Sequence, residues 1–263
     1  MIKKEIYSKI KKLLLNLEKE EDVKILYACE SGSRAWGFPS SDSDYDVRFI
    51  YIRKPQWYLS IDEGRDVIER EIVDEIDLNG WDLKKTLKLY RKSNPPLLEW
   101  LGSPIKYMEQ YSTAQRLRDF LPQFYSPVSC MYHYLHMAQG NIREYLKGEQ
   151  VRLKKYFYVL RPLLACIWIE QSLGPVPTEF MVLVDKLISD KNLKSAILKL
   201  TKDKKEGKEL SYGEKIPAIS AFIEKEITRF KNYKSKIKHH PPDTELLNKI
   251  FRDALKEVWG LDV

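Results

Sequence analysis

The sequence has little cysteine and no long apolar run. Its 263 residues include three cysteines, Cys29, Cys130 and Cys166, which are odd in number and widely spaced. They fit a reducing cytoplasm and provide neither a disulfide framework nor a zinc cluster. The longest apolar stretch, Pro162 to Ile169, is far too short to cross a bilayer. The amino terminus lacks the apolar core of a signal peptide. We therefore expect a cytoplasmic protein without membrane contact.

Charge is distributed unevenly along the chain. Hydrophobic residues make up 43% and charged residues 32% of the sequence, which is typical of a soluble globular protein. Residues 1–110 carry 19 Lys and Arg against 20 Asp and Glu, whereas residues 111–263 carry 26 against 18. This asymmetry predicts carboxylate chemistry in the first part and a surface for polyanions in the second. The alternative is that the lysines merely solvate helices.

Hydrophobic patterning predicts an α+β part followed by an all-helical part. In the first part we expect an amphipathic helix over residues 2–20, strands over 23–29 and 45–52, and one or two more strands within 67–79. A helix capped by Asn79 or Asp82 runs to Arg91, and Asn94 starts another. The later helices are expected at 128–146, 151–172, 177–189, 191–201, 216–237 and 243–259. We therefore place domains at 1–108 and 127–263, with a connecting segment at 109–126.

Two aspartates stand at the start of the second expected strand. Because side chains alternate between faces, Asp44, Asp46 and Arg48 share one face, while the intervening apolar residues form a core face. The two carboxylates would lie roughly 6–7 Å apart along the strand. Such a pair repels unless a cation sits between its members, and a hard ion such as Mg²⁺ prefers oxygen ligands. Without further support, both residues could equally serve solubility.

A glycine and a serine follow the preceding strand. Gly32 allows a phosphate to approach the backbone, and the amides and the Ser33 hydroxyl can donate hydrogen bonds to it. Arg34 and Arg48 would add positive charge near a triphosphate. A strand that ends in Gly-Ser, a loop, and an Asp-x-Asp strand together suit the binding of a metal–nucleotide complex.

These motifs resemble a known family. Gly32-Ser33, ten residues, then Asp44-Tyr45-Asp46-Val47 resembles the signature of the DNA polymerase β superfamily of nucleotidyltransferases. With IDLNGWDLKKTLKL, SNPPLLEWLGSP and KKYFYVLRPLLA, the chain is similar to a bacterial and phage family labelled an RNA repair pathway polymerase-β family. The resemblance implies a small palm-like domain with a mixed sheet, an NTP as donor, and a two-metal mechanism with Mg²⁺, for which Mn²⁺ could substitute. Asp44 and Asp46 would then be metal ligands.

Members of the superfamily use a third carboxylate on a later strand. Asp77, between apolar neighbours, is the favoured candidate as ligand and as base or orienter of the acceptor hydroxyl, and Asp74 and Asp82 are alternatives. Asp82 more simply caps the next helix. In the helical part, Lys154 and Arg161 share one helical stripe that could reach a triphosphate and base. The alternative is a snorkelling lysine and a buried ion pair.

The acceptor is less well defined than the reaction. A basic helical domain and the family resemblance favour an RNA 3′ end. The basic runs Lys191–Lys208 and Arg229–Lys238 could track a phosphate backbone. Transfer to a protein or small-molecule hydroxyl is an alternative, and so is a non-catalytic RNA-binding module. The sequence indicates neither the nucleotide, nor template dependence, nor the oligomeric state.

Overall fold

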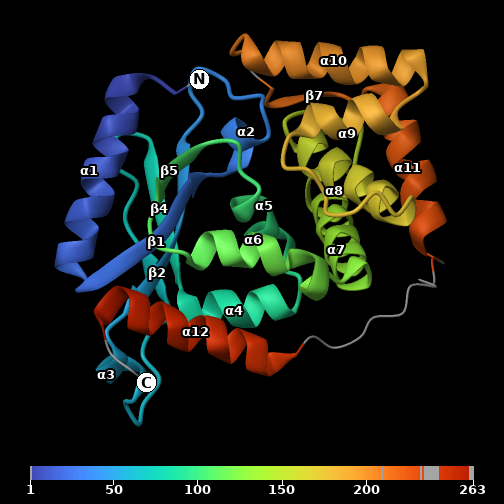
Figure 1. The fold of residues 1–263 in the computed structure, drawn as a ribbon. Coiled ribbons are helices and arrows are strands. Elements are labelled where there is room, and N and C mark those ends of the chain that lie inside the picture. Colours follow the sequence, from blue (N-terminus) through green and yellow to red (C-terminus); the bar gives the residue numbers. More distant parts are fainter. Residues whose placement is uncertain (1, 209, 232, 234–242, 261–263) are drawn as a thin grey trace. The chain divides into compact units, whose positions relative to one another are not determined.

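Neither structural unit of the chain is a continuous stretch of sequence. The computed structural model describes residues 2–208, 210–231, 233 and 243–260 (Figure 1). The first unit consists of the described residues of Met1–Ala35, Asp44–Tyr125 and Pro241–Val263, and the second of those of Trp36–Ser43 and Ser126–His240. None of the described helices is both long and apolar enough to span a bilayer.

A five-stranded mixed sheet forms the centre of the first unit, with strand order β3-β4-β2-β1-β5. Strands β2 and β4 run parallel, and the other neighbours run antiparallel. The strands are β1 (Val23–Glu30), β2 (Tyr45–Arg53), β3 (Val67–Glu69), β4 (Ile76–Asp82) and β5 (Lys106–Glu109). The predicted α+β class with a mixed sheet is confirmed. Strand β5 was not expected, because its four residues are too few to show a period.

Helices cover both faces of this sheet (Figure 1). On one face, the apolar stripe of α1 (Lys4–Glu20) packs against alternating side chains of β1 and β2. On the other face lie α4 (Leu83–Arg91), α5 (Pro95–Leu101), α6 (Thr113–Phe124) and α12 (Thr244–Trp259). The short helices α2 (Gly32–Ala35) and α3 (Pro55–Tyr58) follow β1 and β2 along the chain. The apolar side chains of the sheet are therefore buried on both of its faces.

The second unit is mostly helical, as expected. Its elements are α7 (Pro127–Tyr145), α8 (Lys155–Glu170), α9 (Phe180–Leu187), α10 (Lys191–Lys205), α11 (Pro217–Lys231) and a two-stranded antiparallel sheet of β6 (Gln150–Arg152) and β7 (Tyr212–Glu214). The expectation of a helix from residue 151 was wrong at its start. The amides of Leu153 and Lys154 donate to the carbonyls of Ser211 and Leu210. These bonds extend the pairing of β6 with β7, so the helix begins later than expected. Of the basic run Arg229–Lys238, residue 232 and residues 234–238 lie outside the described residues.

The division into units differs from the expected domains in three places. Helix α12 belongs to the first unit because its apolar side chains, including Leu247 and Ile250, are buried in the core beneath the sheet. Helix α6, placed in the expected connecting segment, packs into the same core. The loop 36–43 belongs to the second unit, where buried Phe38 stacks on Phe157 with 4.4 Å between ring centroids. In sequence terms, the second unit holds 21 Lys and Arg against 13 Asp and Glu.

Candidate active site

Strand β2 changes character along one face. Asp46 and Arg48 occupy the start of this face and are partly exposed, whereas Ile50 and Ile52 further along are buried beneath the helices. The opposite face of the strand is buried from Tyr45 to Tyr51, which confirms the expected alternation. One face of β2 is thus polar at its start and apolar further along, and the buried apolar part fixes the position of the strand.

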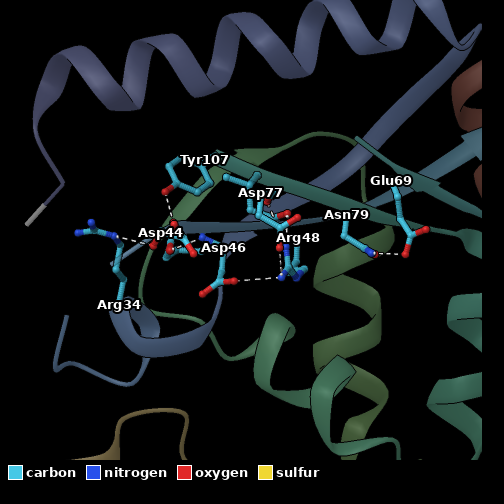
Figure 2. Close-up of polar contacts among 10 residues, drawn as sticks. Arg34, Asp44, Asp46, Arg48, Glu69, Asp77, Asn79 and Tyr107 are labelled. Atoms are coloured by element: carbon cyan, nitrogen blue, oxygen red, sulfur yellow. Dashed lines mark hydrogen bonds and ion pairs between the residues drawn. The ribbon is translucent and has the colours of Figure 1, made fainter. Parts of the chain in front are cut away.

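Asp46 and Asp77 lie opposite each other on the parallel strands β2 and β4. Arg48 joins them: one guanidinium nitrogen, Nη2, lies 3.1 Å from Asp46 Oδ1 and 2.7 Å from Asp77 Oδ2 (Figure 2). Asp77 is partly exposed between buried Ile76 and Leu78, as its apolar neighbours predicted. The register therefore brings together two of the three predicted carboxylates and one predicted arginine.

The environment of Asp46 disfavours its negative charge. Burial raises the pKa of this carboxyl, the neighbouring charges of Asp77 and Asp44 raise it further, and the Arg48 guanidinium opposes them. An added cation would stabilise the ionised form for the same electrostatic reason. The start of β2 is thus a place where positive charge is favoured.

The turn after β1 lies against the Asp46 carboxylate. Gly32, the first residue of α2, has a φ of +55°, and a Cβ built on it would lie 2.1 Å from Asp46 Oδ2. The amide of the preceding Ser31 donates to the Asp46 carbonyl at 2.8 Å. Only glycine combines this backbone conformation with this approach. The predicted phosphate-binding turn, Gly32 and Ser33, is therefore adjacent to the Asp-x-Asp strand.

Asp44 and Arg34 lie at the edge of this group. Asp44 is exposed and directly precedes β2, and its carbonyl accepts a hydrogen bond from Arg34 Nε at 3.1 Å. The Arg34 guanidinium also covers the Tyr45 ring, 3.8 Å from its centroid. The backbone contact thus links α2 to the segment that carries both aspartates (Figure 2).

A buried carboxylate that the sequence analysis did not single out for this site orients Asp46. Glu30, the last residue of β1, is fully buried, and its Oε1 accepts a hydrogen bond from the Asp46 amide at 2.9 Å. Its Oε2 accepts from the Tyr107 hydroxyl. Burial raises the pKa of Glu30 to about 7. The available signal was a charged residue that ends an apolar strand, but its partner Tyr107 lies on the unexpected strand β5.

The alternative third carboxylates have other partners. Asp74 is largely exposed and forms an ion pair with Lys9. Asp82 is buried and caps α4, accepting a hydrogen bond from the Lys84 amide at 2.7 Å, which is the simpler interpretation of this residue. Asp77 alone of the three lies opposite Asp46 in the strand register.

The oxygen donors at β2 suit a hard divalent cation. Carboxylates are the ligands that Mg²⁺ prefers, and Asp44, Asp46 and Asp77 supply them within one strand pair and the residue before it. In the side-chain arrangement of the described residues, no group of three or more His, Cys, Asp or Glu is placed to hold a metal. The charge of Arg48 stands there instead, so a metal ion would compete with its guanidinium for Asp46.

The two basic residues predicted in the helical part differ in environment. Lys154 is exposed just before α8 and lines a cavity of about 340 Å³ in the second unit. Arg161 is almost fully buried, donates to the carbonyls of Pro177 and Thr178, and lies 5.0 Å from the Trp36 ring centroid. Arg161 thus helps to hold the loop 36–43 within the second unit.

Residues 6–253 match the RNA repair pathway DNA polymerase beta family (RlaP), and the chain belongs to this family, as its motifs predicted. It is 49% identical over 247 residues to the uncharacterized protein YcgL of Bacillus subtilis (strain 168), covering 94% of this chain and 95% of that protein.

A solved structure of a nucleotidyltransferase-like protein from Exiguobacterium sibiricum 255-15 also aligns with the chain. The alignment covers 92% of this chain and 87% of the other, with 11% identity and a TM-score of 0.33. A score of this size does not establish a common fold, so the family assignment depends on the sequence match.

Proposed function

We propose that the protein transfers a nucleoside monophosphate from an NTP to the 3′ hydroxyl of an RNA, releasing pyrophosphate. The observation that carries this proposal is the packing of the Gly32 backbone against the Asp46 carboxylate, with Asp77 opposite Asp46 on the parallel strand. The proposed phosphate-binding turn is thus adjacent to two carboxylates. The family name, which refers to an RNA repair pathway, supports RNA as the acceptor.

Asp44 and Asp46 are the proposed ligands of two Mg²⁺ ions, with Asp77 sharing one of them. When bound, the ions supply positive charge that stabilises the pentavalent transition state at the α-phosphorus. The acceptor oxygen forms a bond to the α-phosphorus. At the same time, the bond between the α-phosphorus and the oxygen that bridges it to the β-phosphate breaks, and pyrophosphate leaves. Asp77 orients the acceptor hydroxyl and accepts its proton. The reaction needs no protein nucleophile, because positioning and electrostatics lower the barrier.

The remaining residues bind and neutralise the triphosphate. Amides at Gly32 and Ser33 donate to the β- and γ-phosphates, and the Ser33 hydroxyl adds a further donor. Arg48 would balance charge on the departing pyrophosphate, and Arg34 would support it from α2. In the second unit, Lys154 is exposed and available to a phosphate, whereas buried Arg161 packs on the Trp36 ring.

The test is to incubate the protein with Mg²⁺ or Mn²⁺, each labelled NTP in turn, and total RNA. Label is then followed in the RNA, protein and small-molecule fractions. We expect label in RNA, and its loss by at least about a hundredfold in Asp46→Asn and Asp77→Asn, because both remove a group placed at the reacting atoms. Asp74→Asn is the matched control, since this exposed aspartate pairs with Lys9 instead.

Each other outcome contradicts part of the proposal. Label in protein or in small molecules would replace the RNA acceptor by a protein or metabolite hydroxyl. Absence of label everywhere, with RNA retained on the protein, would indicate a non-catalytic RNA-binding module. Equal loss in Asp74→Asn and Asp77→Asn would remove Asp77 from the site.

A further inference from the structure

Five side chains of the second unit form an aromatic–cation cluster that the proposed reaction does not use. Lys155 Nζ lies 4.0 Å from the Tyr145 ring centroid and 4.7 Å from that of Tyr158. The Arg152 guanidinium lies 5.8 Å from the Tyr145 centroid and 5.4 Å from that of Tyr212. Two cations are thus shared among three tyrosine rings.

The cluster is formed by residues of the β6–β7 strand pair, the end of α7 and the first turn of α8. Arg152 and Tyr212 are paired residues of the antiparallel strands β6 and β7. Tyr145 is the last residue of α7, and Lys155 is the first of α8. The pairing of β6 with β7, where the sequence predicted the start of a helix, therefore helps to bring these five side chains together.

The rings of the cluster lie at the surface. Tyr212 is 62% exposed and Tyr158 is 42% exposed, so neither ring serves the core. Exposed cation–π pairs contribute little to stability. Large exposed aromatic surfaces next to cations are, in contrast, the arrangement on which nucleobases stack in proteins that bind single strands.

Positive charge is concentrated around the rings. Burial lowers the pKa of Lys155, and the neighbouring charges of Lys154 and Arg152 lower it further, while Glu144 opposes them. An anion bound there would relieve the repulsion between these cations. Lys154 also lines the 340 Å³ cavity, where three lysines (with Lys204 and Lys208) and two serines (Ser40 and Ser211) face one carboxylate, that of Asp42. The cavity adjoins the strand pair that carries part of the aromatic–cation cluster, because Ser211 and Leu210, which line the cavity, accept hydrogen bonds from the amides of residues 153 and 154.

We propose that the aromatic–cation cluster stacks the bases of single-stranded RNA and that the adjoining basic cavity holds its backbone phosphates. The choice of RNA rests on the proposed function. A single strand is specified because ring stacking needs an unpaired base, whereas a duplex presents its backbone and the base edges in its grooves. Tyr158 lies 5.5 Å from Trp36 between ring centroids, and Trp36 directly follows Ala35, the last residue of α2.

The test measures binding of a fluorescein-labelled 12-nucleotide RNA by anisotropy, without NTP or metal. We expect Tyr158→Ala and Tyr212→Ala each to weaken binding about tenfold, the effect of losing one stacked base. Tyr132→Ala is the matched control: Tyr132 is also 42% exposed on a helix of the second unit, and no cation of the described residues covers its ring. Unchanged affinity of both cluster variants, or equal loss in the control, would overturn the proposal.

A second measurement uses the unaltered protein, so that it does not depend on the folding of a variant. RNA containing 5-iodouridine is cross-linked by light, and the attached peptides are sequenced. Cross-links to Tyr145, Tyr158 or Tyr212 support the proposal, and cross-links confined to other segments overturn it. Because neither assay requires turnover, an inactive enzyme that still binds RNA here would fail the proposed reaction and leave the RNA surface established.

Discussion

Among single residues, Gly32 and Arg48 bear most directly on the chemistry of the site. Arg48 forms ion pairs with Asp46 and Asp77 together, at 3.1 and 2.7 Å, and its charge opposes the effect of burial on Asp46. Gly32 allows the backbone to approach Asp46 where any side chain would collide with the carboxylate. The site is therefore sensitive to small changes at positions that are not themselves acids or bases.

Replacing Gly32 by alanine tests this close approach. The new methyl would lie 2.1 Å from Asp46 Oδ2, so the carboxylate must move, and the φ of +55° adds strain of about 1–2 kcal/mol. We expect nucleotidyl transfer to fall on the order of a hundredfold, as for a misplaced reacting group. Gly37→Ala is the control, since its φ is also positive and no atom lies within 4 Å of the added Cβ. Equal loss of transfer in both variants would exclude the collision as the cause.

Among the elements, α4 depends on a buried cap. Asp82 accepts hydrogen bonds from the Lys84 amide at 2.7 Å and from the Tyr58 hydroxyl at 2.6 Å, and it is fully buried. Burial raises the pKa of this carboxyl above its ordinary value, although both hydrogen bonds oppose the shift. The cap thus contributes to the fold and makes stability depend on pH.

Asp82→Asn should remove that pH dependence. The folded protein holds the Asp82 proton to a higher pH than the unfolded chain, so unfolding releases a proton between the two pKa values. The stability from this group is therefore fully present below its unfolded pKa and is lost as pH rises through the folded one. We expect the free energy of unfolding in urea to fall with rising pH more in the native protein than in Asp82→Asn. Parallel curves, or a native protein that gains stability relative to the variant, would contradict this.

The elements that the sequence predicted are those with a clear local period. The buried alternation of β2 and the apolar neighbours of Asp77 were visible in the sequence, and they were enough to place Asp46 and Asp77 on comparable faces. Strands β5, β6 and β7 have three or four residues each, which is too short for a period. Glu30 was missed as a partner of Asp46 because it accepts from the Asp46 backbone amide, a contact that no side-chain pattern shows, and its second partner, Tyr107, lies on β5.

Long-range arrangement could not be read from patterning at all. The apolar stripe of α12 shows that the helix needs a partner, but it does not say which core receives it. The position of Arg48 between Asp46 and Asp77 depends on a side-chain conformation, which strand alternation leaves open. The expected domain boundaries failed to include such returns of the chain.

For the whole molecule, the unequal charge of the two units has a measurable effect. The second unit holds eight more basic than acidic residues, whereas the first has 24 Lys and Arg against 25 Asp and Glu. If three or more phosphates are contacted, single-stranded RNA should bind about tenfold or more weakly in 200 mM than in 50 mM KCl. Lys204→Gln should reduce the slope of log affinity against log salt, and exposed Lys12→Gln in α1 should not. A slope near zero would show that phosphates are not bound.

The discontinuous units also dictate an order of events during synthesis. Helix α12 closes the core of the first unit, yet it leaves the ribosome more than a hundred residues after α6, which packs into the same core. At roughly 5–20 residues per second, the nascent first unit waits several seconds or longer with part of its core open. The loop 36–43 similarly waits for Phe157 and Phe180 of the second unit before Phe38 is covered. Every segment of the second unit, in contrast, precedes α12 in the chain, so a ribosome stalled just before α12 would carry all of the second unit and a first unit whose core is still open.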